Sequence, residues 1–195
     1  MLFYKTVLKS KRLDLRLAYN KPKIVKKMFE QLHSSIGDEM SLFIAGGAAI
    51  DPNVIRDYEA MGVPMIQGYG MTENSPIIAV NRDCYSKADS VGKPMPGTDV
   101  KIIDPDEDGI GEIICKGPSV MIGYYDNPEE TAKVLRDGWL YTGDYGRMDD
   151  EGFLYITGRT KEIIVLPSGE NVSPAELETY FYAVDTVQDC LVYED

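Results

Sequence analysis

The chain has 195 residues, enough for one large domain or two small ones with a real hydrophobic core. Hydrophobic residues make up 44% and charged residues 27%, as in ordinary globular proteins, and no low-complexity tract indicates disorder. The 32 acidic residues exceed the 20 basic ones and give a net charge of −12, which argues against nucleic acid as a partner, because phosphate backbones require basic surfaces.

The cysteines and the apolar runs limit the cellular context. Cys84, Cys115 and Cys190 are odd in number and contain no Cys-x-x-Cys pair, so neither a disulfide framework nor a zinc site is indicated. The first residues lack the apolar core of a signal peptide, and no run of about 18 apolar residues is present. We expect a cytoplasmic protein without a transmembrane segment, and leave peripheral membrane contact and oligomeric state open.

The first predicted elements alternate between helix and strand. Apolar residues three and four apart predict a surface helix over 22–36 that ends near Gly37 and carries the sole histidine, His33. No serine or cysteine motif accompanies His33, so catalysis by a histidine-activated nucleophile is not indicated. A short buried strand is expected over 41–45, and a helix with an aspartate cap and an early proline over 51–62.

A glycine-rich segment follows the next strand. Residues 64–67 predict a strand that runs into a turn at Gly68-Tyr69-Gly70. Ligands of open α/β sheets bind at such strand ends, so we expect a binding site here. The third glycine of a dinucleotide fingerprint is replaced by Glu73, and the chain has no phosphate loop of the Gly-x-x-x-x-Gly-Lys-Ser/Thr type, so neither classical nucleotide motif applies.

From about Gly92 the pattern predicts a small, mostly antiparallel β unit with one short helix that starts at Asn127-Pro128. Acidic and glycine residues mark its hairpin turns. The expected strands include 99–104, 111–116 and 153–157. A strand over 162–166, a helix over 173–184 and a strand over 187–193 complete the prediction. The fold class is therefore mixed α/β.

Six segments in this order and spacing carry a family resemblance: Gly46-Gly47-Ala48, Gln67 to Glu73, Val91 to Pro94, Gly111 to Ile113, Gly138 to Asp144 and Gly158 to Glu162. They resemble the adenylate-forming superfamily, which comprises acyl-CoA synthetases, luciferases and the adenylation domains of peptide synthetases. The similarity covers roughly residues 43 to 195.

The resemblance implies an adenine site. The Gly46-Gly47-Ala48 loop would lie along the base, and Tyr69 would stack on it. Glycine removes the side chains that would block a flat ring, and an aromatic face offers the ring a partner. Read alone, the two glycines indicate only a turn between a strand and a helix. The implied nucleotide-binding set also includes Gln67, Gly68 and Gly70.

The resemblance also implies roles for charged and polar residues. Thr72 would bind the α-phosphate of ATP, and Glu73 would hold Mg²⁺, which prefers carboxylate and phosphate oxygens. Asp144 would accept the ribose hydroxyls, with Arg159 as a cationic donor nearby. Lys161 matches the hinge about which the family's small C-terminal domain rotates. Read alone, Thr72 and Glu73 indicate a helix cap, Asp144 a turn residue and Lys161 a solvated side chain.

The implied reaction is ATP-dependent joining of a carboxylic acid to coenzyme A. Residues 165–172 are similar to long-chain fatty acyl-CoA synthetases, so we expect a fatty acid as the substrate. An aryl-CoA ligase and a carrier-protein-loading adenylation enzyme remain alternatives within the family. A noncatalytic nucleotide-binding module is the alternative outside it.

The chain departs from the family pattern at both ends. The Ser/Thr/Gly-rich phosphate loop and the late lysine of the C-terminal domain are absent, so we expect an internal fragment that is inactive alone. The expected parts are the rear of the large N-terminal domain over 1–92, a β-rich subdomain over 93–158, and the hinge and start of the C-terminal domain over 159–195.

Overall fold

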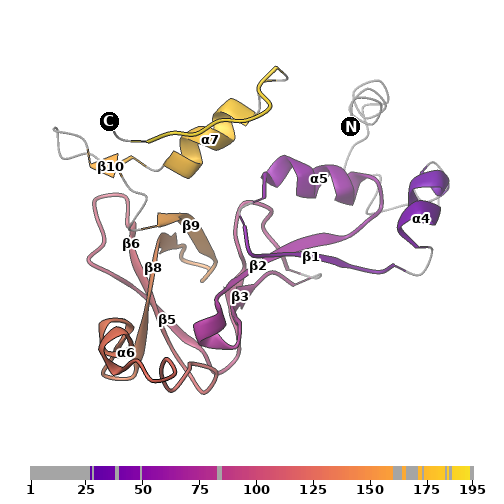
Figure 1. The fold of residues 1–195 in the computed structure, drawn as a ribbon. Coiled ribbons are helices and arrows are strands. Elements are labelled where there is room, and N and C mark those ends of the chain that lie inside the picture. Colours follow the sequence, from indigo (N-terminus) through magenta and orange to yellow (C-terminus); the bar gives the residue numbers. More distant parts are fainter. Residues whose placement is uncertain are drawn as a thin grey trace.

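The computed structural model describes residues 27, 29–37, 40–48, 50–82, 85–159, 164–165, 171–172, 174–182, 184 and 186–193. These residues form a mixed α/β fold, as predicted, with one sheet of four strands and one of five (Figure 1). None of the described helices combines the length and the apolarity that crossing a membrane requires.

The first sheet has the strand order β1-β2-β3-β4. Strands β1 and β2 are parallel and are joined by helix α5, as parallel neighbours require a crossover connection. Strands β3 and β4 extend the sheet in antiparallel fashion. The bounds are β1 Phe43–Ala45, α5 Pro52–Ala60, β2 Met65–Gly70, β3 Ile77–Val80 and β4 Lys93–Pro94.

Helix α5 begins where its local sequence predicts. The Asp51 side chain accepts a hydrogen bond from the Asn53 backbone N–H at 2.8 Å, and Pro52 occupies the first turn, where no backbone donor is needed. Figure 1 shows α5 lying beside β1 and β2, and its Ile55 side chain is buried. The helix therefore covers this part of the sheet.

Helix α4, Glu30–Ile36, ends at Gly37 as predicted, but the expectation of a surface position for His33 is wrong. His33 is buried, and its Nε2 donates to the Met61 carbonyl at 3.0 Å. Met61 follows the last turn of α5. The histidine thus joins two helix ends that lie 28 residues apart, a contact that helical spacing within α4 does not reveal.

The glycines of β2 lie in the strand itself, so the predicted turn at Gly68-Tyr69-Gly70 is wrong. Gly68 and Tyr69 pair with β3, and the register shifts between Tyr69 and Gly70. The chain reverses only over 71–76. A Cβ on Gly70 would lie 2.0 Å from the Pro76 carbonyl oxygen, so glycine serves here for a close backbone approach.

The second sheet is antiparallel, which confirms the predicted β-rich unit. Its order is β5-β6-β8-β7, and β9 also pairs with β8. Helix α6 precedes β7, and the Asn127 side chain accepts from the Glu130 N–H at 3.2 Å, as its spacing predicts. The bounds are β5 Asp99–Ile103, β6 Gly111–Lys116, α6 Pro128–Val134, β7 Leu135–Arg136, β8 Trp139–Met148 and β9 Leu154–Arg159.

The two sheets share one hydrophobic interior. Strand β3 of the first sheet contributes Ile78 and Ala79, each fully buried. Ile78 packs with Cys115 of β6 and Leu140 of β8, and burial raises the pKa of the Cys115 thiol to about 11. Ala79 belongs to the neighbouring cluster around Leu154 of β9. Apolar burial across this contact holds the sheets together.

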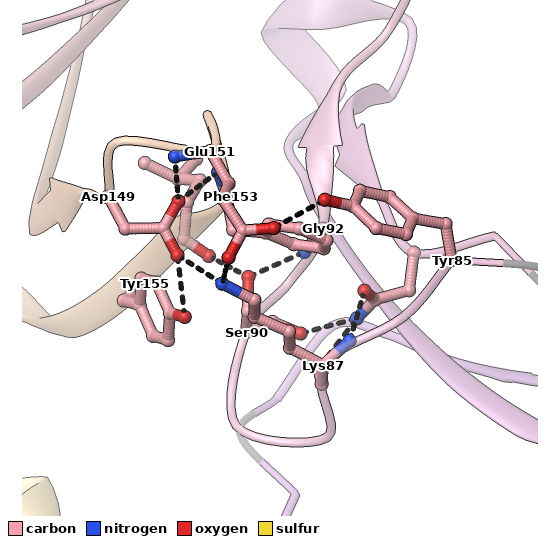
Figure 2. Close-up of polar contacts among 10 residues, drawn as sticks. Tyr85, Lys87, Ser90, Gly92, Asp149, Glu151, Phe153 and Tyr155 are labelled. Carbon is pink, nitrogen blue, oxygen red and sulfur yellow. Dashed lines mark hydrogen bonds and ion pairs between the residues drawn. The ribbon is translucent and has the colours of Figure 1, made fainter.

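A lysine adds a polar connection between the sheets (Figure 2). Lys87 Nζ lies 2.6 Å from Asp149 Oδ2 and 2.7 Å from Glu151 Oε1, in the turn between β8 and β9. Tyr155 donates to the same Asp149 oxygen at 3.0 Å, and the Phe153 N–H donates to the other at 2.8 Å. We refer to Lys87, Asp149, Glu151 and Tyr155 as the Lys87 junction.

Backbone contacts continue this connection. Val91 N–H donates to the Leu154 carbonyl at 3.0 Å, and Leu154 N–H donates to the Gly92 carbonyl at 2.8 Å. Ser90 Oγ also donates to the Leu154 carbonyl, at 2.6 Å. The segment before β4 is thereby paired with the start of β9.

The C-terminal part contains strands β10, Ile164–Val165, and β11, Asn171–Val172, followed by helix α7, Pro174–Tyr182. Helix α7 agrees with the predicted helix, whose first predicted residue, Ser173, lies outside the described residues. The strand predicted over 187–193 is wrong, because these described residues adopt no strand conformation.

Candidate functional site

Two glycine segments of the first sheet lie side by side. Strand β1 pairs with β2 so that Ala45 lies opposite Gln67, which places Gly46 beside Gly68. A Cβ on Gly46 would lie 3.4 Å from the Gly68 carbonyl oxygen, and Gly47 adopts a positive φ of 86°. Gly46, Gly47 and Ala48 are exposed. The edge next to Gly68 therefore presents bare backbone.

The Thr72-Glu73 pair follows β2 on a single 3₁₀ turn, Thr72–Asn74. Ser75 N–H closes the turn onto the Thr72 carbonyl at 3.1 Å, with Ser75 in the left-handed region. Asn74 is fully buried and donates to the Ile77 carbonyl at 2.8 Å. The buried Asn74 anchors the turn, while Thr72 is exposed and Glu73 is half-buried.

Asp144 lies in a bulge of β8. The Thr142 hydroxyl donates to the Ile113 carbonyl of β6 at 2.7 Å and accepts from the Asp144 N–H at 3.1 Å. Gly143 between them has φ of 70°, a conformation that glycine adopts without steric cost. The β6–β8 register shifts at this point. The Thr-Gly-Asp sequence thus builds a local distortion that orients the aspartate.

The Asp144 carboxylate joins the two sheets. Tyr69 Oη of β2 donates to Asp144 Oδ2 at 2.6 Å, and Arg159 Nε of β9 donates to Oδ1 at 2.7 Å. Arg159 lies directly opposite Asp144 in the β8–β9 pairing. Asp144 is 5% exposed, whereas the Arg159 side chain is 60% exposed. Tyr69 and Arg159, which the family resemblance assigned to one nucleotide site with Asp144, therefore converge on the Asp144 carboxylate.

The environment of Tyr69 keeps its hydroxyl protonated. Burial and the adjacent Asp144 carboxylate raise the pKa of Tyr69 well above its ordinary value. The tyrosine ring packs against both buried clusters of the interior. Tyr69 is thus a fixed donor whose bond to Asp144 connects strands 75 residues apart.

The remaining predicted site residues are placed differently. Gln67 is buried, and its side-chain amide donates to the Ala88 carbonyl at 2.8 Å, so it supports the segment that carries Lys87. Gly70 marks the close approach to Pro76 described above. Lys161 lies outside the described residues.

Sequence reasoning missed Tyr124. Its hydroxyl donates to Glu73 Oε1 at 2.9 Å, across 51 residues of sequence. The only local signal was the predicted helix start at Asn127-Pro128. It fixes the chain just after Tyr124 but does not predict the contact between Tyr124 and Glu73.

Glu73 fits a metal that arrives with a nucleotide. Within the described ranges, no group of three or more histidine, cysteine, aspartate or glutamate residues could hold an ion. Mg²⁺ is commonly held by one or two carboxylates together with substrate phosphates. Glu73, half-buried beside the exposed Thr72, offers one such carboxylate.

Comparison with known proteins connects this geometry with a family. The model of the AMP-binding enzyme family matches residues 7–125, more than half of the chain. A long-chain-fatty-acid–CoA ligase of Bacillus subtilis strain 168 is 43% identical over 157 residues, or 76% of this chain and 28% of the relative. A feruloyl-CoA synthase of an Amycolatopsis species is 38% identical over 156 residues, or 76% of this chain and 32% of the relative.

Solved structures give the same result. O-succinylbenzoate coenzyme A synthetase of Bacillus subtilis in complex with AMP matches with a TM-score of 0.74 and 32% identity, covering 87% of this chain and 37% of that one. The chain spans 28% and 32% of the two curated relatives named above. The extent of the family match and the shared fold establish that the chain belongs to the AMP-binding enzyme family.

Proposed function

We propose that the chain is part of an ATP-dependent ligase that activates a carboxylic acid as its adenylate and transfers the acyl group to coenzyme A. The observation that carries the proposal is the convergence of Tyr69 and Arg159 on the buried Asp144 carboxylate. A carboxylate fixed by two donors from separate sheets is suited to hold a polar ligand at the boundary between them.

In this proposal Asp144 binds the ribose. An ionised carboxylate has about four lone-pair sites on its two oxygens, so it can accept ribose hydroxyls while it keeps protein donors. Arg159 supplies a cationic donor at the exposed side. The Tyr69 ring lies next to the base, and the bare backbone of Gly46-Gly47-Ala48 lies along its plane.

Thr72 and Glu73 serve the phosphates. The exposed Thr72 hydroxyl donates to the α-phosphate, and Glu73 supplies a carboxylate ligand for Mg²⁺. The metal, when bound, neutralises phosphate charge. Gln67, Gly68 and Gly70 belong to the wall of the site, where Gly68 borders the acyl chain.

The proposed reaction has two steps. A carboxylate oxygen of the acid attacks the α-phosphorus of ATP, which forms the acyl-adenylate and expels pyrophosphate. The thiolate of coenzyme A then attacks the acyl carbonyl carbon, which forms the thioester and releases AMP. Lys161 is the proposed hinge between these steps, and the proposed parts of the chain remain 1–92, 93–158 and 159–195.

A long-chain fatty acid is the proposed acid. The similarity of residues 165–172 to fatty acyl-CoA synthetases and the name of the Bacillus subtilis ligase support it. The feruloyl-CoA synthase favours an aryl acid as a second candidate. Since the chain spans less than a third of both relatives, we further propose that it is inactive without the rest of the protein.

ATP–pyrophosphate exchange tests the proposal. The intact protein is assayed with Mg²⁺ and fatty, aromatic or amino acids, beside Asp144→Asn, Asp144→Ala and the 195-residue chain. We expect exchange with long acyl chains, a loss of about a hundredfold or more in both Asp144 variants, and none in the isolated chain. Asp99→Asn, an exposed position on β5, is the matched control.

Each alternative has its own outcome. Exchange only with aromatic acids would assign the protein to the aryl ligases, and exchange only with amino acids to carrier loading. Absence of exchange from a folded intact protein would leave a nucleotide-binding module. Full activity of Asp144→Asn would remove Asp144 from the site.

A further inference from the structure

Glu73 is held by a loop from the second sheet. Tyr124 Oη donates to Glu73 Oε1 at 2.9 Å, and the Met121 backbone N–H donates to the Glu73 carbonyl at 2.7 Å. The segment between β6 and α6 therefore binds both the main chain and the carboxylate of one residue. The proposed function uses that carboxylate but assigns nothing to this loop.

Tyr124 is itself fixed by the start of α6. Its backbone N–H donates to Thr131 Oγ1 at 2.9 Å, and that hydroxyl donates to the Asn127 carbonyl at 2.8 Å. A Cβ on the preceding Gly123, whose φ is 151°, would lie 3.0 Å from Thr131 Cγ2. The chain thus reaches Tyr124 through a close contact with the helix.

The backbone of Glu73 is fixed independently. The neighbouring Asn74 is fully buried; its side-chain Nδ2 donates to the Ile77 carbonyl, and its side-chain Oδ1 accepts from the Cys115 thiol at 3.8 Å. These contacts leave the Glu73 side chain free to rotate, so a further contact is needed to restrain its carboxylate. Tyr124 supplies that contact.

The phenol suits this task. A tyrosine phenol is neutral at physiological pH, so its hydroxyl can donate to the carboxylate, as the 2.9 Å bond to Glu73 Oε1 shows. A phenol that donates to a carboxylate forms a strong, charge-assisted bond without adding a charge. Among the described residues, Tyr124 is the sole hydrogen-bond partner of the Glu73 carboxylate, and its bond is to Oε1.

We infer that Tyr124 is a positioning residue for metal coordination: its hydroxyl restrains Oε1 of Glu73 and directs Oε2 towards the divalent cation that accompanies ATP. This inference rests on the proposed function. Residues that hydrogen-bond metal-binding carboxylates orient them, and their loss typically weakens metal affinity or activity by about 10–100-fold.

Calorimetric titration of ATP into the intact protein tests the inference without turnover. No acid substrate is present, and the dissociation constant is measured with Mg²⁺ and with chelator. In Tyr124→Phe we expect the gain in ATP affinity that Mg²⁺ causes to fall by about tenfold or more. The dissociation constant of metal-free ATP should equal that of the wild type. Tyr125→Phe, at a fully exposed neighbouring ring, should change neither constant.

A double-mutant cycle separates positioning from a general structural effect. Glu73→Gln should lose the Mg²⁺ dependence, and adding Tyr124→Phe should then cause no further loss. Equal weakening of ATP with and without Mg²⁺ in Tyr124→Phe would indicate a structural role and overturn the inference, as would an unchanged Mg²⁺ effect. Failure of the wild type to bind ATP would instead count against the proposed function.

Discussion

At the residue scale, Asp144 shows how a buried charge is accommodated. Burying an ionised carboxylate is costly unless it is paired and hydrogen-bonded. Tyr69 and Arg159 each donate to one of its oxygens, and the Thr142 hydroxyl accepts a hydrogen bond from the Asp144 backbone N–H. The tyrosine bond is the deeper one, because Arg159 is largely exposed.

Tyr69→Phe tests the value of that bond. Loss of the hydroxyl leaves Asp144 Oδ2 without its donor, so we expect the free energy of unfolding to fall by about 1–3 kcal/mol. If ribose occupies this oxygen, AMP should restore part of the loss and raise the melting temperature more in the variant than in the wild type. Urea denaturation and thermal shift with AMP measure both effects.

The control for this change is Tyr125→Phe, whose ring is fully exposed. It removes the same atom and should leave stability unchanged. Equal stability of Tyr69→Phe and the wild type would mean that Asp144 does not depend on the tyrosine.

At the element scale, the β8–β9 hairpin depends on its turn. Asp149 accepts the N–H groups of Glu151 and Phe153 with one oxygen and Lys87 and Tyr155 with the other. Five residues farther back along β8, Asp144 faces Arg159 in the same hairpin. The Lys87 junction therefore secures the register on which that pairing depends.

Lys87→Met should destabilise the protein in a pH-dependent way. The bond from Lys87 holds the pKa of Asp149 well below its usual range and also lowers that of Glu151. A depressed folded-state pKa gives stability that is present above the unfolded value of about 4 and is lost as pH falls through the folded value. The difference between wild type and variant should thus shrink below about pH 4.

Urea midpoints at pH 7, 4 and 2 measure this effect. Lys133→Met is the matched control, because Lys133 pairs with Glu130 on the exposed face of α6 and surface pairs contribute little. A difference that stays constant across this range would contradict the assignment of the junction to Asp149 and Glu151.

The sequence predicted the elements whose signals are local. The caps of α5 and α6 at Asp51 and Asn127 require only a few neighbouring residues. Strand β8 was missed because its Gly143 and Asp144 are poor strand formers and occupy a bulge. Lys87 was missed for another reason: its partners lie 62 and 64 residues away, and no spacing rule connects them.

At the candidate site, too, sequence motifs pointed to residues but not to their long-range contacts. The family resemblance assigned Tyr69, Asp144 and Arg159 to one site, and the structure brings the three together. They did not reveal that Tyr69 donates to Asp144, since its hydroxyl finds that partner only when the sheets meet. Tyr124 carried no motif signal because its role depends on a loop reaching back to Glu73.

At the scale of the whole molecule, we expect the two sheets to unfold as one cooperative unit. Leu154 of β9 is fully buried, packs with Ala79 of the first sheet and Ile113 of the second, and bonds through its backbone to the segment before β4. Its side chain and its backbone therefore secure the same contact.

Leu154→Ala should lower the free energy of unfolding by about 2–5 kcal/mol, because a cavity opens at this contact. Trp139 fluorescence and far-ultraviolet circular dichroism should still report one coincident transition at a lower urea midpoint. Ile122→Ala, at a fully exposed side chain, is the control and should leave the midpoint unchanged. Two separated transitions in the wild type would contradict cooperative unfolding.

The connection between Tyr69 and Asp144 also bears on the order of folding. Arg159 follows Asp144 by 15 residues in one hairpin, whereas Tyr69 precedes it by 75. Short loops close at lower entropic cost than long ones. We therefore expect a chain emerging during synthesis to form the Asp144–Arg159 pair within the hairpin first, and to complete the proposed nucleotide site only when the first sheet docks.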